Sequence, residues 1–151
     1  MLSEIAEKIQ ICVACGTCVG GCLVSRLDKR FRPMRIIHTA VVDVNRLINE
    51  PSVWLCSYCY ICSERCPKAV EFPDILTRLR NYIAKHGNLP AAYKMLLANI
   101  SKHGTALELD EFALMEREEY GLPDPSPSQE TIKEIKSIIN TSGLSVFIRE
   151  G

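Results

Sequence analysis

The sequence has no excess of either charge and no long apolar segment. Eighteen Lys and Arg balance eighteen Asp and Glu, so the chain lacks the basic surface of a nucleic-acid-binding protein and the polybasic signal of a membrane-surface protein. Its longest uncharged run, residues 9–25, is shorter than the roughly 20 apolar residues of a membrane span and includes four cysteines. The hydrophobic content of 47% is nevertheless enough for a packed core.

The sequence also lacks the short motifs of common enzymes. It has no nucleophile elbow, no glycine-rich phosphate loop and no dinucleotide fingerprint. His38, His86 and His103 have no spacing that suggests metal binding or acid–base catalysis. We therefore expect no catalytic residue in this chain and expect substrate chemistry to take place elsewhere.

The first residues lack the features of a secretory signal. Residues 1–7 are acidic and amphipathic, with neither a basic n-region nor an apolar h-region, and Leu2, Ile5 and Ile9 share one face of a predicted helix. We expect a cytoplasmic protein whose thiols stay reduced. In that compartment a high density of cysteines indicates metal binding rather than disulfides.

Cysteine is unusually frequent for a chain of 151 residues. The eight cysteines form two copies of C-x2-C-x2-C-x3-C, and the second copy follows the first by 44 positions. This run is typical of proteins that bind two [4Fe–4S] clusters, in which the fourth cysteine of each motif binds the cluster of the other. We therefore predict one cluster on Cys12, Cys15, Cys18 and Cys66, and a second cluster on Cys56, Cys59, Cys62 and Cys22.

A structural zinc site is the main alternative for these cysteines. Zinc sites present two pairs of ligands separated by a longer spacer and use four ligands in all. A third cysteine at the same three-residue step has no evident use in such a site. The two triplets, each followed by a further cysteine, therefore favour iron–sulfur clusters.

Helix signals recur along the chain, whereas strand signals are scarce. We therefore predict an all-α fold, an α-helical ferredoxin with two [4Fe–4S] clusters and a C-terminal extension helix. The predicted helices, with their apolar faces where these are clear, are residues 33–48 (Ile37, Val41, Val44, Ile48), residues 73–87 (Ile75, Leu76, Leu79, Ile83), residues 90–104 and residues 128–143 (Ile132, Ile135, Ile138, Ile139).

Three regions are expected from the composition. Residues 1–104 form the dicluster domain, residues 105–127 an acidic segment and Pro-rich linker, and residues 128–151 a capped helix with an apolar tail. Because the last region is too short to bury its own apolar face, it either clamps a partner, which we favour, or folds back on the dicluster domain.

Two further groups of residues surround the motifs. Tyr58 and Tyr60, inside the second motif, are expected to shield a cluster from water, and Trp54 is expected in the core. A basic stretch follows the first motif and forms either a solvated face or a docking surface: Arg26, Lys29, Arg30, Arg32 and Arg35.

The two cysteine blocks resemble those of the C subunit of heterodisulfide reductase. The segments concerned are Cys12-Val13-Ala14-Cys15-Gly16-Thr17-Cys18 and Cys56-Ser57-Tyr58-Cys59-Tyr60-Ile61-Cys62-Ser63-Glu64-Arg65-Cys66-Pro67. The later order, a helix, then Tyr120-Gly121-Leu122-Pro123, then a short final helix, is similar as well. Leu23 after the first block departs from the commoner Cys-Pro of this family.

The resemblance implies an α-helical ferredoxin subunit with all eight cysteines as cluster ligands. In that family the C subunit connects two larger subunits. The A subunit carries flavin and iron–sulfur clusters, and the catalytic B subunit cleaves the mixed disulfide of coenzyme M and coenzyme B. It thus implies a non-catalytic electron relay in an oxidoreductase complex, in methanogenesis or in a related metabolism. The alternatives are a diffusible dicluster ferredoxin, the electron-carrying subunit of another oxidoreductase, and a zinc-stapled interaction module.

Overall fold

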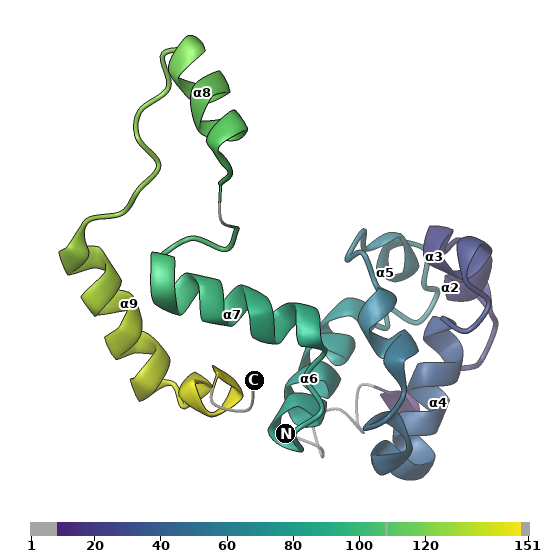
Figure 1. The fold of residues 1–151 in the computed structure, drawn as a ribbon. Helices are drawn as coiled ribbons and strands as arrows, with labels where there is room; N and C mark the ends of the chain where they lie inside the picture. The colour runs from purple at the N-terminus through teal and green to yellow at the C-terminus, as the bar shows by residue number, and fades with distance from the viewer. Residues whose placement is uncertain (1–8, 108, 149–151) are drawn as a thin grey trace. The chain divides into compact units, whose positions relative to one another are not determined.

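The structure, a computed structural model, describes residues 9–107 and 109–148. In these ranges every regular element is helical, which confirms the predicted all-α class (Figure 1). No helix in the same ranges has both the length and the hydropathy to cross a lipid bilayer. The chain divides into two compact units, here called the N-terminal unit (residues 1–88) and the C-terminal unit (residues 89–151).

The N-terminal unit consists of short helices joined by the loops that carry the cysteines. Most of the helix predicted over residues 2–9 lies outside the described residues; Ile9, at its end, is buried in the core. In chain order the elements are α2 (Thr17–Gly20), α3 (Leu23–Leu27), α4 (Pro33–Asp43), η1 (Val44–Leu47), η2 (Pro51–Leu55), α5 (Ile61–Glu64) and α6 (Phe72–Lys85).

Helix α6 lies at the centre of the core. Its predicted face of Ile75, Leu76, Leu79 and Ile83 is confirmed, since all four side chains are fully buried. Each burial of this kind stabilises the fold by roughly 1.5–3 kcal/mol relative to an exposed side chain. The helix therefore holds the second motif, which ends shortly before it, against the rest of the unit.

Helix α4 and the turn after it bury only part of the predicted face, because Ile37 is in the core and Val44 packs against it. Ile36 and Ile37 are buried, whereas Val41 is 53% exposed, so the expected stripe through Val41 is wrong. After Asp43 the chain tightens into the 3₁₀ turn η1, which has about three residues per turn instead of 3.6. This change buries Leu47 at the end of the segment.

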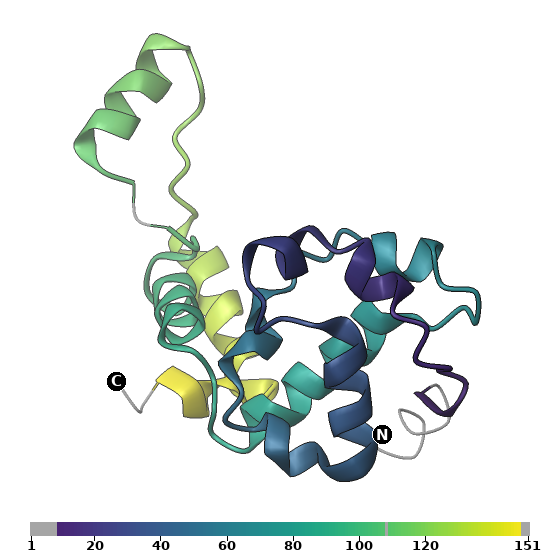
Figure 2. The same ribbon diagram turned by 90° about the vertical axis from the view of Figure 1, so that its right-hand side faces the viewer.

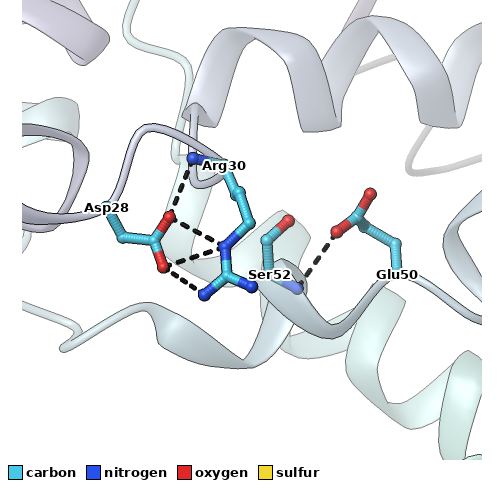
Figure 3. Close-up of polar contacts among 4 residues, drawn as sticks. All are labelled: Asp28, Arg30, Glu50 and Ser52. Atoms are coloured by element: carbon cyan, nitrogen blue, oxygen red, sulfur yellow. Dashed lines mark hydrogen bonds and ion pairs between the residues drawn. The ribbon is translucent and has the colours of Figure 1, made fainter.

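Two groups of polar contacts fix the loops beside the motifs (Figure 3). Asp28 accepts hydrogen bonds from the backbone N–H of Arg30 at 2.9 Å and from its guanidinium at 2.6 Å, and these bonds lower the pKa of Asp28 to about 2. Glu50 caps η2 by accepting from the N–H of Ser52 at 3.2 Å, and it also accepts from Arg35 of α4 at 3.0 Å. Because η2 leads into the second motif, Glu50 ties that motif to α4.

The C-terminal unit contains α7 (Ala91–His103), α8 (Glu111–Glu119), α9 (Gln129–Thr141) and η3 (Leu144–Ile148). Both α9 and η3 pack against α7 (Figure 1 and Figure 2). The final helix therefore buries part of its apolar face inside its own unit, with Ile139 only 5% exposed. Ile138, predicted on the same face, is 65% exposed, so this face is narrower than predicted.

The boundary between the units differs from the expected one. It falls between Asn88 and Leu89, so α7 belongs with the last helices, whereas the composition predicts a dicluster domain that continues to residue 104. Gly104 ends α7 in the left-handed region, with φ of 75°. The linker packs against this glycine, since a Cβ added at Gly104 would lie 2.5 Å from Cγ of Pro127. The physical reason for the difference is that α9 and η3 cover α7.

Candidate metal centres

The two cysteine motifs share one backbone conformation. Ala14 and Gly16 in the first motif have φ of 53° and 77°, and Tyr58 and Tyr60, each 44 positions later, have φ of 53° and 60°. Left-handed residues of this kind reverse the chain, so each motif wraps inward as its cysteines pass. The repeat seen in the sequence is therefore a repeat in space as well.

Each motif then continues into a four-residue helix. Gly16 is the N-cap of α2 and Tyr60 is the N-cap of α5, and these two short helices contact each other. Tyr60 adopts the left-handed conformation without the freedom of glycine, and its hydroxyl donates a hydrogen bond to Asp74 of α6 at 3.2 Å. The contact between α2 and α5 brings the two motifs together.

Backbone N–H groups point at several of the sulfur atoms. The N–H of Ser25 donates to Sγ of Cys22 at 3.4 Å, and the N–H of Val70 donates to Sγ of Cys66 at 3.3 Å. The N–H of Tyr58 donates to Sγ of Cys56 at 3.4 Å. Hydrogen bonds to a charged acceptor favour its charged form, so these donors suit thiolate ligands.

The first cavity combines cysteines from both motifs. It holds about 410 Å³ of space between protein atoms, part of it open to solvent, and Met34, Ile37, Val70 and Phe72 contribute apolar walls. The cysteines that line it are Cys12, Cys15, Cys18, Cys62 and Cys66. The first three come from the first motif, whereas the last two come from the second.

The second cavity is built in the same way. It holds about 310 Å³ by the same measure, with walls that include Phe31, Tyr60 and Phe72. The cysteines that line it are Cys22, Cys56, Cys59 and Cys62. Cys62 and Phe72 line both cavities, so the two spaces are neighbours.

The chemistry of the thiols fits metal ligation. Burial is the main cause that raises the pKa of Cys18, Cys56 and Cys62, for Cys62 to about 11, so these thiols need a nearby cation to become thiolates. The pKa of Cys15 is lowered, mainly by a hydrogen bond with the Thr17 hydroxyl. Coordination to a metal deprotonates a thiol outright, and soft thiolates are the ligands that iron–sulfur clusters use.

The sulfur atoms surround two cavities and do not converge on single points. Within residues 9–107 and 109–148 no three His, Cys, Asp or Glu side chains converge on a point where a single metal ion would be held. All eight predicted ligands line one cavity or the other, so the donors are arranged in two groups. The donors present therefore fit two [4Fe–4S] clusters.

Sequence reasoning missed Arg80 of α6, which is only 8% exposed. Its Nε donates to the carbonyl of Val53 at 3.0 Å, and its guanidinium carbon lies 4.8 Å from the centre of the Tyr58 ring. The signal was present in the sequence, because Arg80 is one residue after Leu79 and three before Ile83, on the buried side of the helix. A charged residue at such a position marks a site that the hydrophobic pattern alone does not explain.

The comparisons define the class of the protein. The family profile described as a 4Fe-4S dicluster domain matches residues 8–70, the segment that contains both motifs. The all-α fold and the two thiol-lined cavities agree with this match. The chain is thus a dicluster iron–sulfur protein that carries two [4Fe–4S] clusters, and its function is electron transfer.

Relatives with matching sequence along most of the chain define the family. The C subunit of the Ferredoxin:CoB-CoM heterodisulfide reductase of Methanosarcina mazei is 33% identical, over 93% of this chain and 89% of that protein. The C subunit of the H(2):CoB-CoM heterodisulfide,ferredoxin reductase of Methanothermobacter marburgensis is 31% identical, over 94% of this chain and 79% of that protein. This chain belongs to the family of heterodisulfide reductase C subunits, which makes it one component of an oxidoreductase.

The shared backbone conformation predicts that Gly16→Ala lowers the free energy of unfolding. No protein atom lies within 4 Å of a Cβ added at Gly16, so we expect the cost of placing alanine in the left-handed region, about 1–2 kcal/mol. We expect this loss in urea unfolding of the cluster-loaded protein under anaerobic conditions. Gly20→Ala is the matched control, because that site is equally open but has no positive φ. Equal destabilisation by both variants would contradict a strained turn at Gly16.

Proposed function

We propose that this protein is the non-catalytic electron-relay subunit of a heterodisulfide reductase complex. In this proposal it connects an A subunit, which carries flavin and iron–sulfur clusters, to a catalytic B subunit, which reduces the mixed disulfide of coenzyme M and coenzyme B. The observation that supports it most is that two thiol-lined cavities share Cys62 and Phe72 within one compact unit. The relatives named above, whose names include the CoB-CoM heterodisulfide, supply the substrate class.

The ligand sets we propose are crossed between the motifs. Cys12, Cys15, Cys18 and Cys66 would hold one cluster, and Cys56, Cys59, Cys62 and Cys22 the other. The support is that Cys66 lines the cavity of the first three cysteines and Cys22 lines the cavity of the second three. When bound, each [4Fe–4S] cluster supplies a one-electron centre.

The residues around the sulfur atoms support electron transfer rather than catalysis. Phe31, Ile37 and Phe72 are buried walls that exclude water from the cavities. The N–H groups of Tyr58 and Val70 stabilise negative charge on the sulfurs that they contact. Eight thiolates match the eight iron positions of two cubane clusters, so this ligand set offers no iron position to a substrate.

The C-terminal unit offers a surface for a partner subunit. Its α8, not predicted from the sequence, is capped by Asp110, whose carboxylate accepts from the N–H of Ala113 at 2.8 Å. Phe112 and Met115 on this helix are 66% and 67% exposed. Acidic residues flank them, namely Asp110, Glu111, Glu116, Glu118 and Glu119. We propose that this acidic and apolar helix docks on a component of the complex that presents basic groups around an apolar groove.

Cysteine variants test the crossed ligands. Cys66→Ala should remove or alter the same cluster as Cys15→Ala, so the EPR spectrum that remains after reduction should be the same in both variants. Cys22→Ala should likewise match Cys59→Ala. If Cys66→Ala instead matches Cys59→Ala, each motif holds its own cluster and the crossed assignment is wrong.

Co-purification tests membership of a complex. When the tagged chain is co-produced with candidate flavin-bearing and catalytic subunits, both should elute with it, and the double variant Phe112→Ser, Met115→Ser should lose them while keeping its iron. The control pair Lys133→Ser, Lys136→Ser changes exposed positions of α9 and should retain the partners. A wild-type chain that elutes alone with full iron content would favour a diffusible dicluster ferredoxin.

A further inference from the structure

The buried guanidinium of Arg80 lies beside the second cysteine motif. Its Nε donates to the carbonyl of Val53 at 3.0 Å, and its Nη2 donates to the carbonyl of Cys56 at 3.5 Å. Val53 is itself fully buried in the core. The positive charge is therefore held next to the first cysteine of the motif by two backbone carbonyls from the segment that enters it.

Two aromatic rings complete the surroundings of this charge. The guanidinium carbon lies 5.3 Å from the ring centre of Trp54 and 4.8 Å from that of Tyr58. Tyr58 stands between Cys56 and Cys59 in the left-handed conformation, so the turn of the motif places its ring over the cation. The carbonyls and rings that Arg80 contacts are all neutral. A charge buried among neutral groups acts strongly on nearby charges, because the local dielectric constant is low.

The first motif has a different arrangement at the corresponding place. The 44-position repeat aligns Arg80 with Ile36. Alignment of Pro33, which opens α4, with Pro73 in the first turn of α6 instead aligns Arg80 with Ala40. The aligned residue is uncharged in both cases. Lys68 lines the first cavity, but it is exposed, so water and salt screen its charge. The two cavities thus differ in the charge buried beside them.

We propose that Arg80 sets the reduction potentials of the two clusters apart, making the cluster on Cys22, Cys56, Cys59 and Cys62 the more easily reduced. This inference rests on the proposed ligand sets. Reduction adds one electron to a cluster and takes the [4Fe–4S] core from the 2+ to the 1+ state, with no bond broken and no proton needed. A fixed cation nearby favours the more negative state of a cluster. The cluster beside Arg80 therefore accepts the electron first and holds it in the singly reduced protein.

An EPR-monitored redox titration of the full chain, with dithionite as reductant, tests this role. Arg80→Gln keeps a hydrogen-bond donor but removes the charge, and it should lower the ratio of reduced to oxidised Cys56 cluster about tenfold at a given potential, which is about 59 mV for one electron. The other cluster should move less. Arg80→Lys keeps the charge and should retain most of the wild-type difference. Arg78→Gln, an exposed position on the same helix, is the control and should leave both potentials in place.

Three results would overturn the proposal. One is an unchanged potential of the Cys56 cluster in Arg80→Gln at full iron content, and another is an equal shift of both clusters. The third is loss of iron from both Arg80→Gln and Arg80→Lys, which would make Arg80 a packing residue. A wrong ligand assignment would be detected in a separate experiment, because the EPR spectrum of Cys66→Ala would then match that of Cys59→Ala instead of that of Cys15→Ala. It would not change the reduction potentials measured for the wild-type protein.

Discussion

The structure of the N-terminal unit depends on the need to hold thiolates at the edge of an apolar core, where Cys22 and Cys62 are buried and most of the others are partly buried. Burial raises the pKa of Cys62 to about 11, so its thiolate is unfavourable until a positive charge lies beside it. Iron supplies that charge, and a site that exists only in the folded chain links metal binding to folding. The left-handed turns, short helices and inward N–H groups all serve to direct sulfur atoms at two cavities.

The same arrangement explains how one small unit carries two neighbouring centres. Residues of each motif line the cavity of the other, so the sites form together when α2 meets α5. Cys62 and Phe72 line both cavities, which suits electron transfer between them. The surroundings of the two motifs differ, because Arg80 is buried beside the second motif and the residues aligned with it near the first are uncharged.

Much of the site could be predicted from the sequence, because ligand spacing is a local property. The three-residue steps predicted that cysteines of both motifs would be brought together, and the spacing of Ile75, Leu76, Leu79 and Ile83 predicted the buried face of α6. Other features depend on contacts between distant segments. Val41 is exposed because the rest of the unit packs on the side of α4 that carries Ile36 and Ile37. Ile139 is buried in a helix that packs against α7, which the composition alone assigns to the dicluster region. The environment of Arg80 could not be predicted from the sequence, because it depends on backbone carbonyls 24 and 27 positions away.

The most direct test of this account is the iron and acid-labile sulfide content of the full chain, purified without oxygen. Two [4Fe–4S] clusters require about eight irons and about eight sulfides per chain, and zinc should be absent in stoichiometric amount. Stoichiometric zinc without sulfide would contradict the account, because the eight thiols would then hold single ions. About four irons and four sulfides in fully loaded protein would contradict it as well, because one of the two cavities would not be a cluster site.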